Sequence, residues 1–338
     1  MRIKLIIFTE DTAYSKLVSD NISEFHSDSI DVSISDSVKS MGEMLSKRNY
    51  DVALVDSALI NELDMSAINM PLLLWSESDS SDDRPDGFGL INKYQRISSI
   101  VAAIFEQYAT VSRAGRSVGS ENANITAVWS PTGGVGKTSV AIAHALSHAA
   151  TGKDVFYLNL EDFSSTPGHL NDSGKSISSV FEMLENNDGN VNMLIQGICC
   201  NVKGITYLCS PDNFDDMSIL TTENINELIT ACAELTDELI IDLPCAHDSR
   251  TRKTLELANK VLIVTDGSAT SDTKLTQFVS QNTAFESIEK KVTFIANKDA
   301  MLNKPFAEVV VSLPFVQSAD ERTVCEKLAE HTVSGDAI

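Results

Sequence analysis

A glycine-rich stretch near the middle of the chain has the residue types that bind phosphate. It reads SPTGGVGKTS and occupies residues 130–139. Glycines let backbone N–H groups wrap around phosphate oxygens, and such groups at the start of a helix attract anions. Lys137 can bring a positive charge to the outer phosphates, and the Thr138 hydroxyl can bind Mg²⁺. The stretch therefore predicts a site for a nucleotide and its magnesium ion.

The segments on either side support this prediction. ITAVW (125–129) reads as a buried strand, and a helix is expected from about 138 to 150, over the helix-compatible run VAIAHALSHAA. Strand, loop and helix in this order are the context that a P-loop requires, whereas a chance glycine-rich turn with Gly-Lys-Thr does not need it. The predicted phosphate-binding residues are Thr132, Gly133, Gly134, Val135, Gly136, Lys137, Thr138 and Ser139.

One position of the loop departs from the common GxxxxGK[ST] pattern, because Pro131 replaces its first glycine. TGGVGKT instead resembles KGGVGKT, the deviant form of the ParA/MinD group of dimeric ATPases. The resemblance covers about 125–330 and implies ATP, Mg²⁺ and a homodimer. In that group the first lysine of the motif reaches the partner's nucleotide. Here that position is Thr132, which predicts slow hydrolysis and a dimer that rests on apolar surface.

Two acidic positions follow the order of the same group. DELIIDLP (237–244) resembles its Walker B segment, which implies that Asp242 holds Mg²⁺ together with Thr138. A core strand capped by a surface aspartate is the alternative. VFYLNLED (155–162) lies where the group has its D-x-D switch element. Asn159 cannot act as a base, so Glu161 is predicted to orient water, with Lys137 as the second catalytic residue.

The base pocket is predicted from two later segments. FIANK (294–298) resembles the strand end whose asparagine pairs with adenine, and this implies Asn297 in that role. SLPF (312–315) resembles the following loop, whose backbone near Pro314 would line the pocket.

The elements that position these residues alternate along the chain in a βα pattern. Residues 1–108 contain five apolar runs separated by amphipathic stretches, one of which, 13–25, has apolar residues at helical spacing. This predicts a flavodoxin-like parallel sheet. Residues 109–124 are small and polar and predict a linker, and 77–86 predict an acidic loop. A second α/β series, with a mostly parallel sheet, is expected over 125–338.

The front domain resembles a response-regulator receiver at three positions. Asp56, Ser76 and Lys93 end its third, fourth and fifth apolar runs, where a receiver has its phosphoacceptor, hydroxyl and lysine. Receivers also need two adjacent carboxylates after the first strand, whereas this chain has Thr9 and Glu10 there, with Asp11 next, so the pocket is incomplete or shifted. We therefore expect an atypical receiver that is not phosphorylated.

An atypical receiver before a ParA/MinD-like ATPase resembles the TadZ/CpaE family. That resemblance implies a protein that localises the assembly machinery of Flp-type (tight adherence) pili at the cell pole. Its expected partners are pilus secretion-machine proteins and a second copy of the chain. A chromosome- or plasmid-partition ATPase, a MinD-like positioning ATPase and a metabolic ligase of the dethiobiotin synthetase type are the alternatives.

Composition limits these alternatives. The 48 acidic and 26 basic residues give a net charge of -22, which disfavours binding to nucleic acid and to anionic membranes. The six cysteines show no CxxC spacing, and no apolar run is long enough to insert into a membrane. A cytoplasmic protein is the resulting expectation. His144 and His148 have a spacing that can bind metal, but a structural role is favoured because no third ligand is evident.

Overall fold

The computed structural model describes residues 2–27, 29–56, 59, 68–76, 88–111, 123–170, 174–186, 190–281, 285–300 and 310–333. The chain divides into two compact units, Met1–Ser117 and Val118–Ile338. Most of the predicted linker, 112–122, and the predicted acidic loop, 77–86, lie outside the described residues. The last helix of the first unit continues to Val111, three residues beyond the predicted helix end.

The first unit has a sheet whose strands are paired in the order β2-β1-β3-β4-β5, all parallel. This is the flavodoxin-type order, in which ligands are expected at the carboxyl ends of the strands. The strands are β1 (Ile3–Phe8), β2 (Ile30–Ser35), β3 (Tyr50–Asp56), β4 (Ile68–Trp75) and β5 (Gly89–Asn92). The described helices are α1 (Thr12–Phe25), α2 (Val38–Lys47) and α3 (Ile97–Val111).

The second unit has an eight-stranded sheet in the order β13-β12-β11-β6-β10-β7-β9-β8. Neighbouring strands are parallel except β8 and β9, which form an antiparallel hairpin at one edge. The strands are β6 (Asn124–Trp129), β7 (Val155–Asn159), β8 (Cys200–Val202), β9 (Ile205–Tyr207), β10 (Glu238–Asp242), β11 (Lys260–Thr265), β12 (Val292–Ala296) and β13 (Val310–Ser312).

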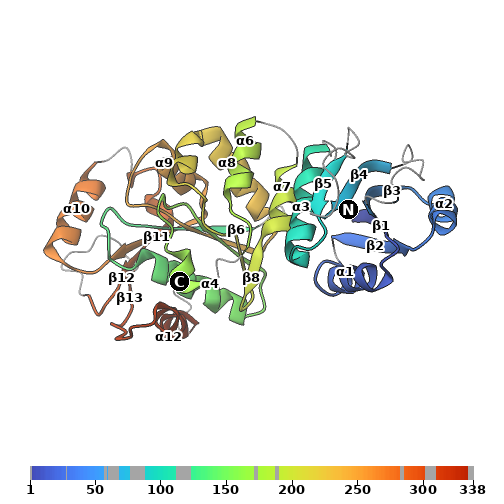
Figure 1. Ribbon diagram of the computed structural model, residues 1–338. Helices are drawn as coiled ribbons and strands as arrows, with labels where there is room; N and C mark the ends of the chain where they lie inside the picture. The colour runs from blue at the N-terminus through green and yellow to red at the C-terminus, as the bar shows by residue number, and fades with distance from the viewer. Residues whose placement is uncertain are drawn as a thin grey trace. The chain divides into compact units, whose positions relative to one another are not determined.

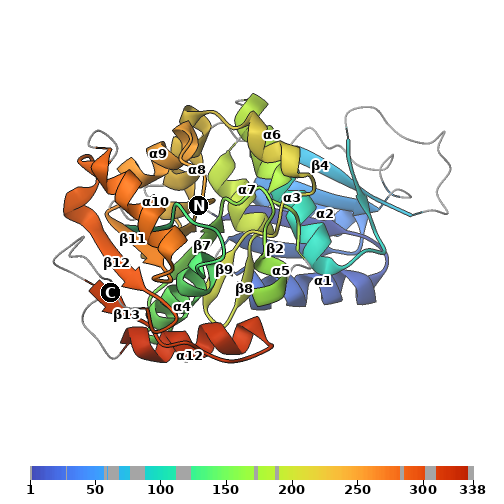
Figure 2. The same cartoon turned by 90° about the vertical axis from the view of Figure 1, so that its left-hand side faces the viewer.

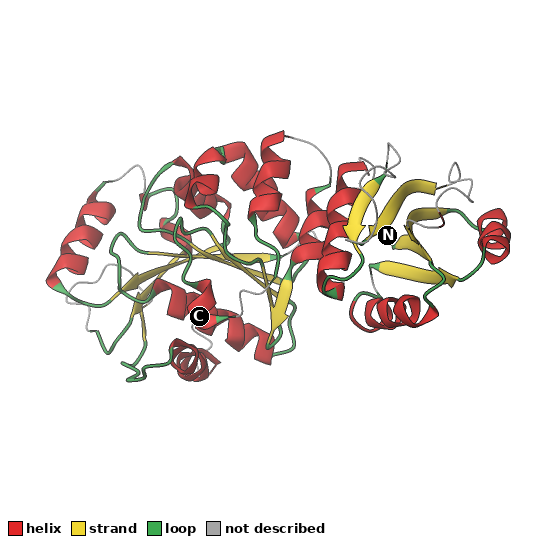
Figure 3. Ribbon diagram, viewed as in Figure 1, coloured by secondary structure: helices red, strands yellow, loops and turns green. Residues whose placement is uncertain are grey.

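Helices cover both faces of this second sheet. Figures 1 and 2 show α4 and α12 on one face and α6, α8 and α9 on the other, and Figure 3 shows the same layers by secondary structure. The helices are α4 (Lys137–Ala150), α5 (Thr166–His169), α6 (Ser178–Asn186), α7 (Val191–Ile198), α8 (Thr222–Ala233), α9 (Ser249–Leu257), α10 (Ala269–Ser280) and α12 (Glu321–Val333), with the 3-10 turns η4 (Phe214–Ile219) and η5 (Glu289–Lys291). No helix of the described residues has the length and apolar character that a membrane crossing needs.

The centre of the sheet determines where the phosphate-binding loop lies. β6 pairs with β10 on one side and β11 on the other, and all three are apolar strands with little exposed surface. Parallel strands covered on both faces are expected to be apolar in this continuous way. The loop joins the carboxyl end of β6 to α4, so it lies at the middle of the carboxyl edge, where α/β sheets bind ligands.

Candidate nucleotide-binding site

Glycine geometry shapes the loop between β6 and α4. Gly134 and Gly136 have φ angles of 76° and 93°, in the left-handed region that glycine adopts at little cost. A Cβ atom on Gly136 would lie 2.4 Å from Nδ2 of Asn297, so a side chain here would clash with that amide. Gly136 is also the N-cap of α4 and makes no side-chain cap hydrogen bond. The first N–H groups of the helix therefore suit an anion.

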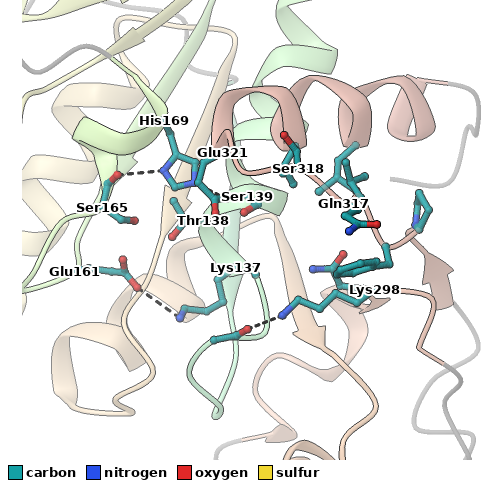
Figure 4. A pocket seen from close by; sticks show the side chains of 18 residues that line it. Lys137, Thr138, Ser139, Glu161, Ser165, His169, Lys298, Gln317, Ser318 and Glu321 are labelled. Atoms are coloured by element: carbon teal, nitrogen blue, oxygen red, sulfur yellow. Dashed lines mark hydrogen bonds and ion pairs between the residues drawn. The ribbon is translucent and has the colours of Figure 1, made fainter.

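Lys137 is buried beside a thiol and a carboxylate. Its Nζ lies 3.2 Å from Sγ of Cys245 and 3.5 Å from Oε1 of Glu161. Burial lowers the pKa of Lys137, but Cys245 and Glu161 raise it, and the net result is a pKa above the ordinary lysine value. The ammonium group is therefore charged at neutral pH. Figure 4 shows Lys137 and Glu161 facing each other in the pocket.

Asp242 ends β10 as a fully buried carboxylate. Its Oδ2 accepts hydrogen bonds from the Tyr157 hydroxyl at 3.0 Å and from Asn159 Nδ2 at 3.3 Å. Its Oδ1 has no hydrogen-bond partner among the described residues. Burial and the negative charge of Glu161 raise the pKa of Asp242 to about 7, although Thr138 and Lys137 act in the opposite direction.

These residues fit a magnesium ion. An unpaired buried carboxylate oxygen is costly unless a ligand satisfies it, and Mg²⁺ prefers oxygen ligands. Thr138 and Asp242 would hold the ion, which would supply charge neutralisation at the phosphates when bound. The alternative of a surface aspartate capping a core strand is wrong, because Asp242 is 0% exposed.

Asn159 has a positioning role that the sequence did not predict. Its Nδ2 donates to the Tyr157 hydroxyl at 3.1 Å and to Asp242, and its Oδ1 accepts from the N–H of Glu161 at 3.0 Å. One amide therefore orients the buried carboxylate and shapes the turn that carries Glu161. The contact with Glu161 is a local side-chain-to-backbone pattern that asparagine often makes two residues ahead. The contact with Asp242 joins two strands and has no local sequence signal.

A cavity of about 520 Å³ brings most of the predicted site together. Its lining includes eight predicted residues: Gly134, Gly136, Lys137, Thr138, Ser139, Glu161, Asn297 and Pro314. The remaining predicted site residues of this unit, Thr132, Gly133, Val135 and Asp242, are not part of the lining. Val135 is fully buried and packs in the core cluster around α4. The lining also contains residues that the sequence did not predict as binding residues: Ser165, His169, Lys298, Phe315, Val316, Gln317, Ser318, Glu321, Val324 and Leu328.

Two hydrogen bonds connect the turn after β12 to the phosphate-binding loop. Nδ2 of Asn297 donates to the Val135 carbonyl at 2.9 Å, and Nζ of Lys298 donates to the Gly134 carbonyl at 2.8 Å. Lys298 has a φ of 61°, which is uncommon for a residue with a side chain. Asn297 therefore lines the cavity while its amide nitrogen supports the loop. Its pairing with adenine stays a prediction.

Thr132 occupies the position of the lysine in the KGGVGKT form. Its side chain is 8% exposed, and its Oγ1 has no hydrogen-bond partner among the described residues. Its N–H donates to the Ser130 hydroxyl at 3.2 Å. Threonine carries no charge, so this position offers no cation to a neighbouring molecule.

The receiver-like residues meet at the carboxyl edge of the first sheet. Asp56 ends β3, Ser76 follows β4 and Lys93 follows β5. Oδ2 of Asp56 accepts hydrogen bonds from Lys93 Nζ at 2.7 Å and from the Thr9 hydroxyl at 2.9 Å. The buried Thr9 therefore lies beside Asp56, while Glu10 is exposed.

The two histidines on α4, His144 and His148, pack against each other. His144 is buried and its ring packs edge-on against that of His148, with centroids 4.5 Å apart. Among the described residues, no group of three or more His, Cys, Asp or Glu side chains could hold a metal ion.

Comparison with known proteins supports the fold. No family model matches the chain, and no curated protein matches it in sequence. Among solved structures, the ParA family ATPase of Chlorobium tepidum aligns with a TM-score of 0.52 and 16% identity over 64% of this chain and 95% of its own. This alignment shows that the chain contains the α/β fold of a ParA family ATPase, with its mostly parallel sheet.

Two further solved structures align less well. The cell division ATPase MinD of Pyrococcus furiosus has a TM-score of 0.46 and 15% identity over 62% of this chain and 98% of its own. A plasmid partition protein of Borrelia burgdorferi has a TM-score of 0.47 and 15% identity over 63% of this chain and 99% of its own.

Proposed function

We propose that this chain is an ATP-binding localisation and assembly factor for a Flp-type pilus secretion machine, in which bound ATP acts as a slow switch. The observation that carries the nucleotide part is the buried carboxylate Asp242, whose Oδ1 has no hydrogen-bond partner among the described residues. The charges of Lys137 and Glu161, which line the cavity, both act on this carboxylate, and the cavity lining also includes the helix start at Gly136. ATP with Mg²⁺ satisfies the buried carboxylate, the ammonium group and the helix start at once.

The localisation part rests on how the chain is organised. The first unit has a flavodoxin-type sheet, and Oδ2 of its Asp56 accepts hydrogen bonds from Lys93 and Thr9, while Glu10 is exposed. Such a unit suits docking of partner proteins better than phosphotransfer. The protein would act in the cytoplasm and reach the pole through its partners, as in the TadZ/CpaE family that its sequence resembles.

Partition of DNA is the second candidate, because the fold matches a ParA family ATPase. The net charge of -22 weighs against it, since binding to the DNA backbone depends on basic residues that neutralise phosphates.

The nucleotide site is tested by Lys137→Ala. Loss of a buried ammonium group that faces the phosphates should weaken Mg-ATP binding by about 100-fold, as measured by calorimetry. Lys274→Ala, on the exposed side of α10, is the matched control and should bind like wild type. An unchanged affinity in Lys137→Ala would remove the P-loop assignment.

The partner class is tested by affinity capture with the full chain and with Lys137→Ala. Enrichment of pilus secretion ATPase and platform proteins is expected. Enrichment of DNA with partition proteins instead, together with a shift of a duplex in a binding assay at physiological salt, would favour the second candidate.

A further inference from the structure

A second cavity, of about 420 Å³, lies beside the nucleotide cavity. Its apolar walls come from three parts of the second unit: α4, the β8–β9 hairpin with the end of α5, and α12. They include Ile142, Leu146, Leu170, Val202 and Cys325. The volume is within the range of pockets that hold small organic molecules. No residue that we predict to bind nucleotide lines it.

The polar groups of this cavity are few and predominantly cationic. Lys203 and Glu326 form an ion pair and so balance each other. Arg322 is exposed at the mouth of the cavity, where Asp320 acts on its charge, and it donates a hydrogen bond from Nη2 to the Leu170 carbonyl at 3.2 Å. A guanidinium group has five donors, so most of this one remains for a ligand.

An apolar chamber with one available guanidinium matches a particular ligand chemistry. The apolar walls favour a hydrocarbon body, and planar guanidinium recognises a carboxylate through two parallel hydrogen bonds. A purely polar metabolite would leave its polar groups unpaired against Ile142 and Leu146. The fit is therefore to an amphipathic carboxylic acid.

His169 is shared between the two cavities. Its side chain is 8% exposed, and Nε2 lies 3.8 Å from Oε2 of Glu321, a residue of the nucleotide cavity. Its Nδ1 lies 3.1 Å from the Ser165 carbonyl, as Figure 4 shows, and Ser165 also lines the nucleotide cavity. Leu170, the next residue, forms a wall of the second cavity. A ligand that moves Leu170 would therefore also move His169, the preceding residue in the chain.

We propose that this second cavity binds an amphipathic carboxylic acid and that its occupancy changes nucleotide affinity through His169. The binding part stands independently of the proposed function, and the coupling part rests on it. Coupling between two ligands is reciprocal, so each should change the affinity of the other by the same factor.

Binding is tested by calorimetry of the full chain with octanoate, and with octan-1-ol as the uncharged match. Octanoate should bind saturably and octan-1-ol about tenfold more weakly, because the alcohol forms no charged pair with Arg322. Arg322→Gln should weaken octanoate by a similar factor, whereas Lys327→Gln, exposed on the same helix, should not. Val202→Trp and Leu146→Trp should each abolish binding by filling the cavity.

Several results would overturn the binding proposal. They are the absence of saturable octanoate binding, equal binding of acid and alcohol, equal effects of the two helix variants, and retained binding in a filled cavity. Circular dichroism establishes that each variant is folded. Two filling variants on different elements ensure that one misfolded protein does not decide the result.

Coupling is tested by measuring the affinity for octanoate with and without saturating Mg-ATP, and the affinity for Mg-ATP with and without saturating octanoate. We expect a factor of about 5 in both directions. In His169→Ala that factor should fall to one, whatever the separate affinities become. His169→Asn, whose amide can replace Nδ1 near the Ser165 carbonyl, should retain part of it. A factor of one in wild type would overturn the coupling while leaving octanoate binding in place. Failure of ATP to bind would instead remove the proposed function.

Discussion

At the residue scale, Cys245 is a reporter of the phosphate site. Its Sγ is 3.2 Å from Nζ of Lys137, and the residue is partly exposed. Phosphates that bind Lys137 would cover this neighbouring thiol and slow its alkylation, because cysteine reactivity depends on access to the thiol.

Nucleotide should therefore protect Cys245 from iodoacetamide. With Mg-ATP at about ten times its Kd, the rate at Cys245 should fall about tenfold, in proportion to the free sites that remain. Mass spectrometry of the alkylated peptide measures this rate, and Lys137→Ala is the control in which protection should disappear. An alkylation rate that ATP leaves unchanged would show that the nucleotide does not contact Lys137.

A second residue-scale prediction concerns Asp56. Its Oδ2 is bonded to Lys93 and Thr9, and the nearby Asp11 is the N-cap of α1, where its side chain accepts from the N–H of Tyr14. Without a pair of carboxylates that can join Asp56 in holding Mg²⁺, a phosphoryl donor lacks the cation that neutralises its charge. We expect no stable acyl phosphate after incubation with acetyl phosphate and Mg²⁺. Intact-mass analysis that finds phosphate on wild type but not on Asp56→Asn would reverse this conclusion.

At the element scale, α4 carries a buried histidine whose pKa affects stability. Burial lowers the pKa of His144 to about 3, and the positive charges of His148, Lys260 and Lys153 act in the same direction. In the unfolded chain the group has its ordinary pKa near 6.5. The unfolded state therefore binds more protons between these two values, and stability must fall as pH decreases through this window.

Lowering the pH from 7 to 4 should cost the second unit about 3 kcal/mol through His144 alone. Denaturant unfolding can be followed by the fluorescence of Trp129, since the other of the two tryptophans, Trp75, is in the first unit and can be changed to Phe. His144→Leu should remove this part of the pH dependence, whereas His331→Leu on α12 should keep it. Parallel stability curves for wild type and His144→Leu would contradict the prediction.

The position of a helix or strand is easier to predict from the sequence than the face that it buries. The strand–loop–helix around 125–150 was predictable to within a residue, because glycines, lysine and apolar runs are local signals. In α1 the helix was predictable but its buried face was not: Leu17 and Phe25, two of the apolar residues at helical spacing, are 62% and 65% exposed, while Val18 and Ile22 are buried. Only tertiary packing decides which stripe of a helix is covered.

Some features of the candidate site could also be predicted from the sequence, and others could not. Residue types at the phosphate-binding loop and at Asp242 were predictable, because they are consecutive or end an apolar strand. The bonds of Asn159 to Asp242 and of Lys298 to Gly134 join residues 83 and 164 positions apart, and no local pattern indicates them. The run ITYLCS (205–210) predicted a strand and contains β9, but the three-residue strand β8 was missed, since so short a strand carries almost no periodic signal.

At the scale of the whole molecule, turnover depends on what a second copy could supply. The KGGVGKT form brings a lysine across a dimer, but here the uncharged Thr132 stands at that position, and the residue is 8% exposed. A missing trans-acting cation can cost on the order of 10³-fold in phosphoryl transfer. No group at this position replaces that charge.

Glu161 adds a second reason for slow turnover. Its carboxylate lies 3.5 Å from Lys137, one methylene further from its backbone than an aspartate would be. A carboxylate displaced by about 1 Å from the position that orients water can lose on the order of 10²-fold. Ground-state binding through Lys137 and the Gly136 helix start is unaffected by either change. We therefore expect tight ATP binding with turnover far below about 1 s⁻¹, an ordinary enzyme rate.

Single-turnover assays at low and high protein concentration measure this rate, with sedimentation to report dimers. The rate should stay low even where dimers form, because the partner's Thr132 offers no charge and any dimer rests on apolar surface. Glu161→Asp is the informative variant: it restores the shorter carboxylate and should raise the rate by up to about 100-fold if misplacement limits the reaction. Glu161→Gln should not raise it. A wild-type rate near 1 s⁻¹ that appears only at high concentration would show that the partner supplies a cation from elsewhere, and ATP would then be consumed too quickly to act as a lasting switch.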